Sequence, residues 1–422
     1  MYQKTTLDNE LRILTAEMPH IRSVTVGFFL GVGSRYEPDE LGGISHFIEH
    51  MLFKGTEKRP TAKEIAVAIE GIGGVFNAST GREMTTYWAK VAQPHLPIAL
   101  DVLVDMLRHA RFDPQEVEKE RRVIIEEINM TRDTPDEWVF SLANRLLWPG
   151  HPLGRDVAGT RESVGGVGRK DLLATLRRYY HPRNAVVAVA GNIQHEEVVD
   201  RIAEYLGDWE PGEISSYLPL EDEQREPRAF VEGRDTEQAH LCLNVPGVSY
   251  THPDRFTFQM LSAVLGQGMS SRLFLEIRER QGLAYSVHSY HSHFQDTGVM
   301  GVYAGVDPRR IEKAVTAILA ELDRLRQEPV EEEELTKTKE FAKGRLMLHM
   351  ENTHAVAAWL GSQELLTGEV LTVDEVVERI DAITAEELQR VAQELFRPDR
   401  LNLAVIGPFE EGEDRFQALL NL

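Results

Sequence analysis

Residues 180–191 read YHPRNAVVAVAG, and residues 396–407 read FRPDRLNLAVIG. Each segment follows a stretch with helical periodicity, LLATLRRY in the first case and ELQRVAQEL in the second. Each then passes through a proline-containing turn into an apolar run that is typical of a buried strand. The recurrence of one helix–turn–strand junction in the two halves of the chain indicates an internal duplication.

Other segments also occur once in each half. Strand-like apolar runs begin at Ser23 and Gln238, and charged helices led by acidic residues begin at Asp113 and Val330. Residues 206–232 between the halves are rich in Pro, Gly, Ser and acidic residues and show no period. We therefore predict an N-terminal domain at 1–212, a linker at 213–232 and a homologous C-terminal domain at 233–422. Each would be an α+β domain in which helices pack on one side of an antiparallel or mixed sheet.

The composition is that of a globular protein. The chain has 422 residues, of which 42% are hydrophobic and 27% are charged, and this excludes wholesale disorder. The net charge of −22 argues against a nucleic-acid partner, because the phosphate backbone would be repelled. The single cysteine, Cys242, lies in the apolar run AHLCLNV and fits a buried thiol in a reducing compartment. We find no signal sequence or membrane-spanning stretch, and we expect a cytoplasmic protein without a membrane partner.

The strongest chemical pattern is HFIEH, residues 46–50. On a helix His46 and His50 are four residues apart and leave the same face, so they can form half of a zinc site. Glu49 lies beside them and can take a proton from a bound water. The order H-x-x-E-H is the inverse of the commoner H-E-x-x-H motif of zinc peptidases.

A hydrolytic zinc site usually has a third protein ligand. The helix predicted from Asp113 offers several acidic residues, among which Glu120 and Glu127 are seven apart and share one face. Spacing alone does not choose between Glu126 and Glu127.

Longer segments resemble a known family. HFIEHMLFKGT at 46–56, NASTGREMTTYWAKV at 77–91 and ERRVIIEEI at 120–128 resemble the zinc helix, the following strand pair and the third-ligand helix of the pitrilysin/insulinase family of inverted-motif zinc peptidases. Within this family the likeness is to the processing-peptidase type, and it extends over essentially the whole chain. The resemblance implies a zinc-dependent endopeptidase whose N-terminal domain is catalytic.

The resemblance also assigns roles. It implies that His46, His50 and Glu127 hold one Zn²⁺ per chain and that Glu49 activates the zinc-bound water. Glu120 would not bind the metal itself but would orient one of its ligands. Asn77 and Ala78 would lie on an edge strand that pairs with the backbone of an extended substrate.

The second half has no paired histidines where the repeat would place them. It does contain LEIRERQGLAYSVHSY from Leu275, in which Arg278 and Tyr285 match the Arg and Tyr that family enzymes bring over the scissile carbonyl. Such a pair would donate hydrogen bonds to the oxyanion of the transition state. In the family, four such domains enclose a chamber, whereas this chain has two. We therefore expect a homodimer in which Arg278 and Tyr285 act in trans.

Two alternatives remain open. The chain could be a non-catalytic scaffold or core-type subunit, although such family members usually lack the zinc ligands. It could also be a zinc hydrolase that acts on something other than a peptide. For the leading hypothesis we expect substrates that are extended peptides or unfolded segments. The acidic charge favours basic peptides if it lines the chamber.

Overall fold

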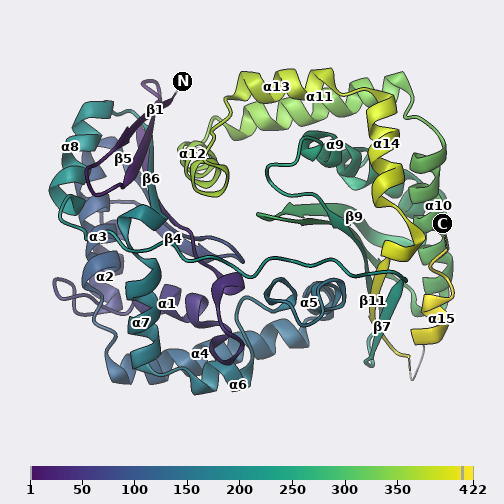
Figure 1. Cartoon of the computed structure of the whole chain (residues 1–422), viewed down its shortest axis with the longest axis horizontal. Coiled ribbons are helices and arrows are strands. Elements are labelled where there is room, and N and C mark those ends of the chain that lie inside the picture. Colours follow the sequence, from purple (N-terminus) through teal and green to yellow (C-terminus); the bar gives the residue numbers. More distant parts are fainter. Residues whose placement is uncertain (1, 410–412, 422) are drawn as a thin grey trace. The chain divides into compact units, whose positions relative to one another are not determined.

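The chain is built around two β-sheets (Figure 1), and the structure, a computed structural model, describes residues 2–409 and 413–421. The first sheet is mixed and has six strands, in the order β1 (Tyr2–Thr6), β2 (Arg12–Glu17), β6 (Ala185–Gly191), β3 (Ser23–Leu30), β5 (Thr85–Ala92) and β4 (Val75–Thr80). The second sheet has five strands, in the order β7 (Arg228–Gly233), β11 (Asn402–Gly407), β8 (Ala239–Gly247), β10 (Gly298–Val306) and β9 (Ala284–His293).

Apart from β1, which has no equivalent in the second sheet, the two sheets share one topology. In the first, β2 runs parallel to β6, and β3, β5 and β4 follow antiparallel. In the second, β7 runs parallel to β11, and β8, β10 and β9 follow antiparallel. The repeated junctions that suggested duplication lead into β6 and β11, which hold equivalent places. The predicted fold class, two duplicated α+β domains, is confirmed.

The chain divides into two compact units. The N-terminal unit comprises the chain up to Asn129, Arg155–Leu218 and Met347–Thr372, and the C-terminal unit comprises Met130–Gly154, Pro219–Leu346 and the chain from Val373 on. This division differs from the sequence-based boundaries at 212 and 233, because each half of the sequence contributes one helix to the other half's unit. Figure 1 shows the helix from residues 353–367, coloured yellow-green, beside the purple strands of the first sheet.

The helices of the N-terminal unit are α1 (Ile44–Leu52), α2 (Ala62–Glu70), α3 (Leu96–His109), most of α4 (Pro114–Asp133), α6 (Arg161–Gly166), α7 (Arg169–Tyr179), α8 (His195–Leu206) and α12 (Thr353–Thr367). Short 3₁₀ turns lie at Ser34–Tyr36, Asp39–Leu41, Gln93–His95 and Pro182–Asn184. Successive side chains of β3 point to opposite faces of the first sheet. Phe28 lies in the main core with α1 and α3, and Phe29, on the other face, packs against α12. The predicted single layer of helices thus gains a second layer from α12.

The helices of the C-terminal unit are α5 (Pro135–Leu147), α9 (Arg255–Gly266), a π-helix (Phe274–Arg280), α10 (Ile311–Gln327), most of α11 (Glu332–His349), α13 (Val373–Ala382), α14 (Ala385–Leu395) and α15 (Glu413–Gln417). Turns of 3₁₀ helix lie at Pro152–Gly154, Pro308–Arg310 and Pro398–Arg400. Here α5 is the helix from the other half, and it packs on the face of the sheet that includes Cys242. Cys242 is a free, fully buried thiol, as predicted.

Residues 208–227, between α8 and β7, form no helix or strand. The buried guanidinium of Arg35 holds the first part of this segment, because it donates to the carbonyl of Leu218 and stacks on Tyr217. No helix of the described residues is long and apolar enough to cross a membrane.

Candidate metal centre

Helix α1 carries the inverted motif and is fixed at its first turn. Its N-cap is Gly43, at φ +92°, where an added Cβ would lie 2.4 Å from the carbonyl oxygen of Ala158. The buried carboxylate of Glu37 accepts the amide protons of Gly43 (2.7 Å) and Ser45 (2.8 Å), two donors that a helix start leaves without intrahelical partners. The apolar face of α1 is buried in the core, so the direction of the histidine side chains is set by the packing.

The structure brings together His46, His50 and Glu127. The Nε2 atoms of the two histidines are 3.2 Å apart, and the Glu127 carboxylate lies 3.8 Å from His46 Nε2 and 3.6 Å from His50 Nε2. Among the residues that the structure describes, these three form the only group of His, Cys, Asp or Glu that could hold a metal ion, with ligand atoms within 4.8 Å of one another. The group contains Glu127 and not Glu126.

The donor set fits zinc. Two imidazoles and one carboxylate are the ligands of several catalytic zinc sites, which leave a fourth position open. Burial and the neighbouring His50 lower the pKa of His46, although the charges of Glu127, Glu49 and Asp156 act in the opposite direction. A neutral imidazole offers a lone pair, so His46 is suited to bind a metal at physiological pH.

Glu120 contacts Nδ1 of His50, the ring nitrogen that does not face His46. Its Oε1 lies 2.9 Å from His50 Nδ1, and its Oε2 accepts from Lys54 Nζ at 2.7 Å. Burial by itself would raise the pKa of Glu120, but the hydrogen bonds from His50 and Lys54 outweigh it and hold the pKa below its usual value. An ionised Glu120 keeps the proton of His50 on Nδ1 and leaves Nε2 available to a metal.

Glu49 lies on α1 between the two histidines in sequence, and a strand orients it. Thr80 at the end of β4 donates its hydroxyl proton to Glu49 Oε2 at 2.6 Å. This contact, like the one from Glu37 to the start of α1, was not anticipated from the sequence. No helix or strand periodicity predicts either contact, since the partners lie 31 and 6 to 8 residues apart in sequence.

Asn77 and Ala78 lie on β4, the last strand of the first sheet. The side chain of Asn77 is exposed, and its Oδ1 accepts the amide proton of Ala78 at 2.9 Å. Because this amide bonds to a side chain and not to β5, it points to the free edge of the sheet. An edge of this kind can pair with an additional strand.

Arg278 and Tyr285 lie in the C-terminal unit, on the π-helix and at the start of β9. The Arg278 guanidinium carbon lies 4.6 Å from the centre of the Tyr285 ring, so the structure places the two side chains together. Tyr285 is 76% exposed, and its hydroxyl is thus accessible at the surface of this unit.

Known peptidases and zinc proteases are similar to this chain. The profile of a family described as "Insulinase (Peptidase family M16)" matches residues 12–161, and one described as "Peptidase M16 inactive domain" matches residues 166–341. An uncharacterized zinc protease of Bacillus subtilis is 39% identical over 97% of this chain and 98% of its own length. Two crystal structures share the fold. A protease from Helicobacter pylori has a TM-score of 0.91 at 24% identity, covering 97% of this chain and 99% of its own. A peptidase M16 inactive domain from Pseudomonas fluorescens has a TM-score of 0.89 at 16% identity, covering 97% and 98%.

Proposed function

The chain belongs to the insulinase family of peptidases, family M16, and on this premise we propose that it is a zinc-dependent endopeptidase that cleaves extended peptides. The observation that carries the proposal is the convergence of His46, His50 and Glu127, with Glu120 behind His50. Zinc in such a site supplies a Lewis acid that polarises a carbonyl and acidifies water.

Side chains and backbone of the N-terminal unit would then have separate roles in catalysis and in substrate binding. Glu49 is the general base that accepts the proton of the attacking water, and the hydrogen bond from Thr80 holds its carboxylate in one orientation. The free edge of β4, with Asn77 and Ala78, pairs with the substrate backbone, so the chain of the substrate must be extended. The net charge of −22 favours basic peptides over acidic ones.

We further propose that the site is completed by a second copy of the chain. Arg278 and Tyr285 would donate hydrogen bonds to the oxyanion from the partner copy, inside a chamber that the two copies enclose. The adjacency of the two side chains and the exposure of Tyr285 support this role.

A second candidate is a non-catalytic subunit of the same family. The match of residues 166–341 to a profile described as an inactive domain favours it for the C-terminal half. The complete set of His46, Glu49, His50 and Glu127 in the N-terminal half favours the peptidase, because a scaffold has no need to keep a ligand set and a base together.

The test is cleavage of a quenched basic peptide library by the purified full-length chain, with Glu49→Gln beside it. We expect the wild type to cleave, a zinc chelator to stop it, and Glu49→Gln to lose about 100-fold or more of kcat/KM. The variant should still bind one zinc per chain, because Glu49 is not a ligand. Glu126→Gln, on the exposed side of α4, is the matched control and should behave as wild type. A zinc-loaded wild type that cleaves no peptide would support the non-catalytic subunit.

A further inference from the structure

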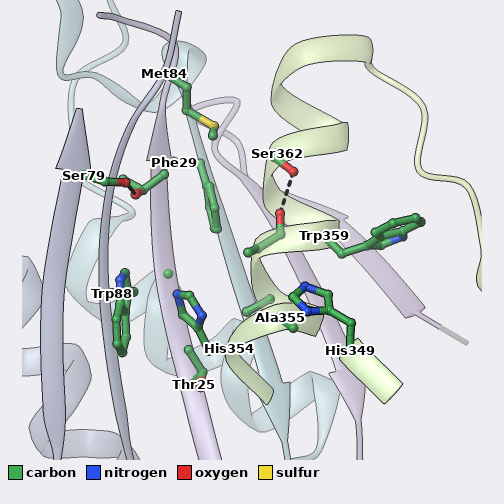
Figure 2. Close-up of a pocket in the computed structure, with 14 residues that line it drawn as sticks. Thr25, Phe29, Ser79, Met84, Trp88, His349, His354, Ala355, Trp359 and Ser362 are labelled. Atoms are coloured by element: carbon green, nitrogen blue, oxygen red, sulfur yellow. Dashed lines mark hydrogen bonds between the residues drawn. The ribbon is translucent and has the colours of Figure 1, made fainter. Parts of the chain in front are cut away.

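A cavity of about 370 Å³ lies on the face of the first sheet opposite α1, where α12 packs over the sheet. All the residues that line it belong to the N-terminal unit. Figure 2 shows the Trp88 and His354 rings at one end of the cavity and Met84 at the other, with Phe29 on the sheet between them. A volume of this size is typical of small-molecule sites in proteins.

The first sheet separates this cavity from the metal centre. Successive side chains of a strand point to opposite faces of its sheet. Phe28 of β3 and Tyr87 of β5 lie in the core with α1, whereas Phe29, Thr86 and Trp88 on the same two strands line the cavity. A molecule bound in the cavity would therefore not touch the zinc ligands, so this site is distinct from the one described above.

Packing fixes the walls of the cavity. The Phe29 ring is confined between two glycines, since an added Cβ would lie 2.2 Å from it at Gly361 and 2.8 Å from it at Gly27. The start of α12 is held on the sheet by the hydroxyl of Thr353, which lies 2.9 Å from the hydroxyl of Thr25. The cavity is thus formed before any ligand enters, as in most small-molecule sites.

The lining favours an uncharged occupant. The described residues that line the cavity include no Asp, Glu, Lys or Arg. Burial, together with Lys90 and His349, lowers the pKa of His354, which favours the neutral form of this ring. A charged molecule would have to leave water without meeting a counter-charge, which is strongly unfavourable.

The lining also favours an aromatic occupant. Phe29, Trp88, His354 and Trp359 all contribute rings, and ring pairs gain more than their buried area alone provides. The Trp359 indole donates to the carbonyl of Leu371 at 2.9 Å. Within the described part of the chain, by contrast, neither the Trp88 indole N–H nor the His354 ring has a hydrogen-bond partner. These two groups are available to a ligand that carries a hydrogen-bond acceptor.

We propose that this cavity is a binding site for a small uncharged aromatic molecule with a hydrogen-bond acceptor, such as a phenol or heterocycle of two fused rings. The molecule would lie against Phe29 and Trp88, and α12 would cover it. Ser79 and His349 are exposed members of the lining, so the cavity is accessible from the surface of this unit. The inference goes beyond the proposed function and does not depend on peptidase activity.

The experiment is isothermal titration calorimetry at neutral pH on the full-length, zinc-loaded protein with four matched probes. Naphthol is neutral and aromatic, naphthalenesulfonate and naphthylmethylamine are its anionic and cationic counterparts, and decahydronaphthol is its saturated counterpart. We expect one naphthol to bind per chain. The charged probes should bind at least about 10-fold more weakly, because the cavity offers no counter-charge. The saturated probe should bind about 3- to 10-fold more weakly, because it lacks the ring–ring contacts.

Two variants test whether the binding occurs in the cavity. Ala358→Phe fills the cavity from α12, and Trp88→Ala removes a ring and the indole N–H on β5. Each should weaken naphthol binding about 10-fold or more. The matched control is Ala174→Phe on the exposed side of α7, which should bind naphthol as wild type does. Thermal unfolding without ligand checks the fold of each variant, and Trp88→Ala serves if Ala358→Phe does not fold.

Saturable naphthol binding that is weakened in the cavity variants and kept in Ala174→Phe supports the site. Absence of saturable binding to the wild type, or binding that the folded cavity variants leave unchanged, overturns it. Equal affinity for a charged or the saturated probe overturns it as well, because the walls would then not select a neutral aromatic molecule. None of these measurements uses a peptide, so a protein that binds naphthol but cleaves no peptide would contradict the proposed function and leave this site standing.

Discussion

At the residue scale, Glu120 acts on the metal centre only through His50. Replacing it by Gln removes the charge that holds the proton on His50 Nδ1 and leaves Lys54 without its ionic partner. We expect Glu120→Gln to weaken zinc binding by about 10- to 100-fold. Competition with a chelator of known affinity measures this, and Glu126→Gln on the same helix is the control. Unchanged affinity in Glu120→Gln would show that another contact orients His50.

From the sequence, only the part of the site that lies within one short helical segment can be predicted. His46, Glu49 and His50 are recognisable because four-residue spacing on a helix places both rings on one face. Glu127 required the family resemblance, because spacing did not distinguish it from Glu126. In the structure the rotation of α4 directs Glu120 to His50 and Glu127 to both His46 and His50.

At the element scale, the start of α1 depends on Glu37. Its carboxylate accepts two amide protons in a buried site, whereas the amide of a Gln side chain has one acceptor atom and adds two donors. We expect Glu37→Gln to destabilise the protein by about 1–3 kcal/mol. Zinc affinity should fall as well, because both histidines follow within two turns.

Urea unfolding and chelator competition measure the two effects of Glu37→Gln. Glu40→Gln, three residues on and exposed, is the control and should change neither. A variant that loses stability but binds zinc as tightly as wild type would show that core packing alone positions α1.

Elements with their own sequence signature were predictable. The charged helix from Asp113 exists as α4, with the Asp113 side chain accepting from the amide of Gln115 at 2.8 Å at its start. The apolar runs from Ser23 and Gln238 exist as β3 and β8. The placement of α5 and α12 was not predictable, because nothing in a helical pattern says which of two similar sheets it will cover. The cavity beside α12 depends on that placement and could not be predicted either.

At the scale of the whole molecule, the duplication was readable because helix, turn and strand are adjacent in sequence in both repeats. The shared strand order shows that the duplication covers a complete five-stranded sheet and not only one helix–turn–strand junction. Each unit also takes one helix from the other half of the sequence, so neither half contains a complete unit. We infer that residues 1–212 alone would leave uncovered the sheet face on which Val356 and Leu360 of α12 pack.

The completion of the site by a second copy predicts complementation between inactive variants. Glu49→Gln lacks the base, and Arg278→Ala lacks the donor that the partner would supply. If each site takes Glu49 from one copy and Arg278 from the other, a mixed dimer contains one intact site and one site that lacks both groups. Random pairing makes half of the dimers mixed, so co-expression of the two variants should restore about a quarter of the wild-type kcat. Peptide cleavage by the co-purified mixture, against each variant alone, measures this. If Arg278 instead served the site of its own chain, every site in the mixture would lack one group, and activity would stay at the level of the single variants.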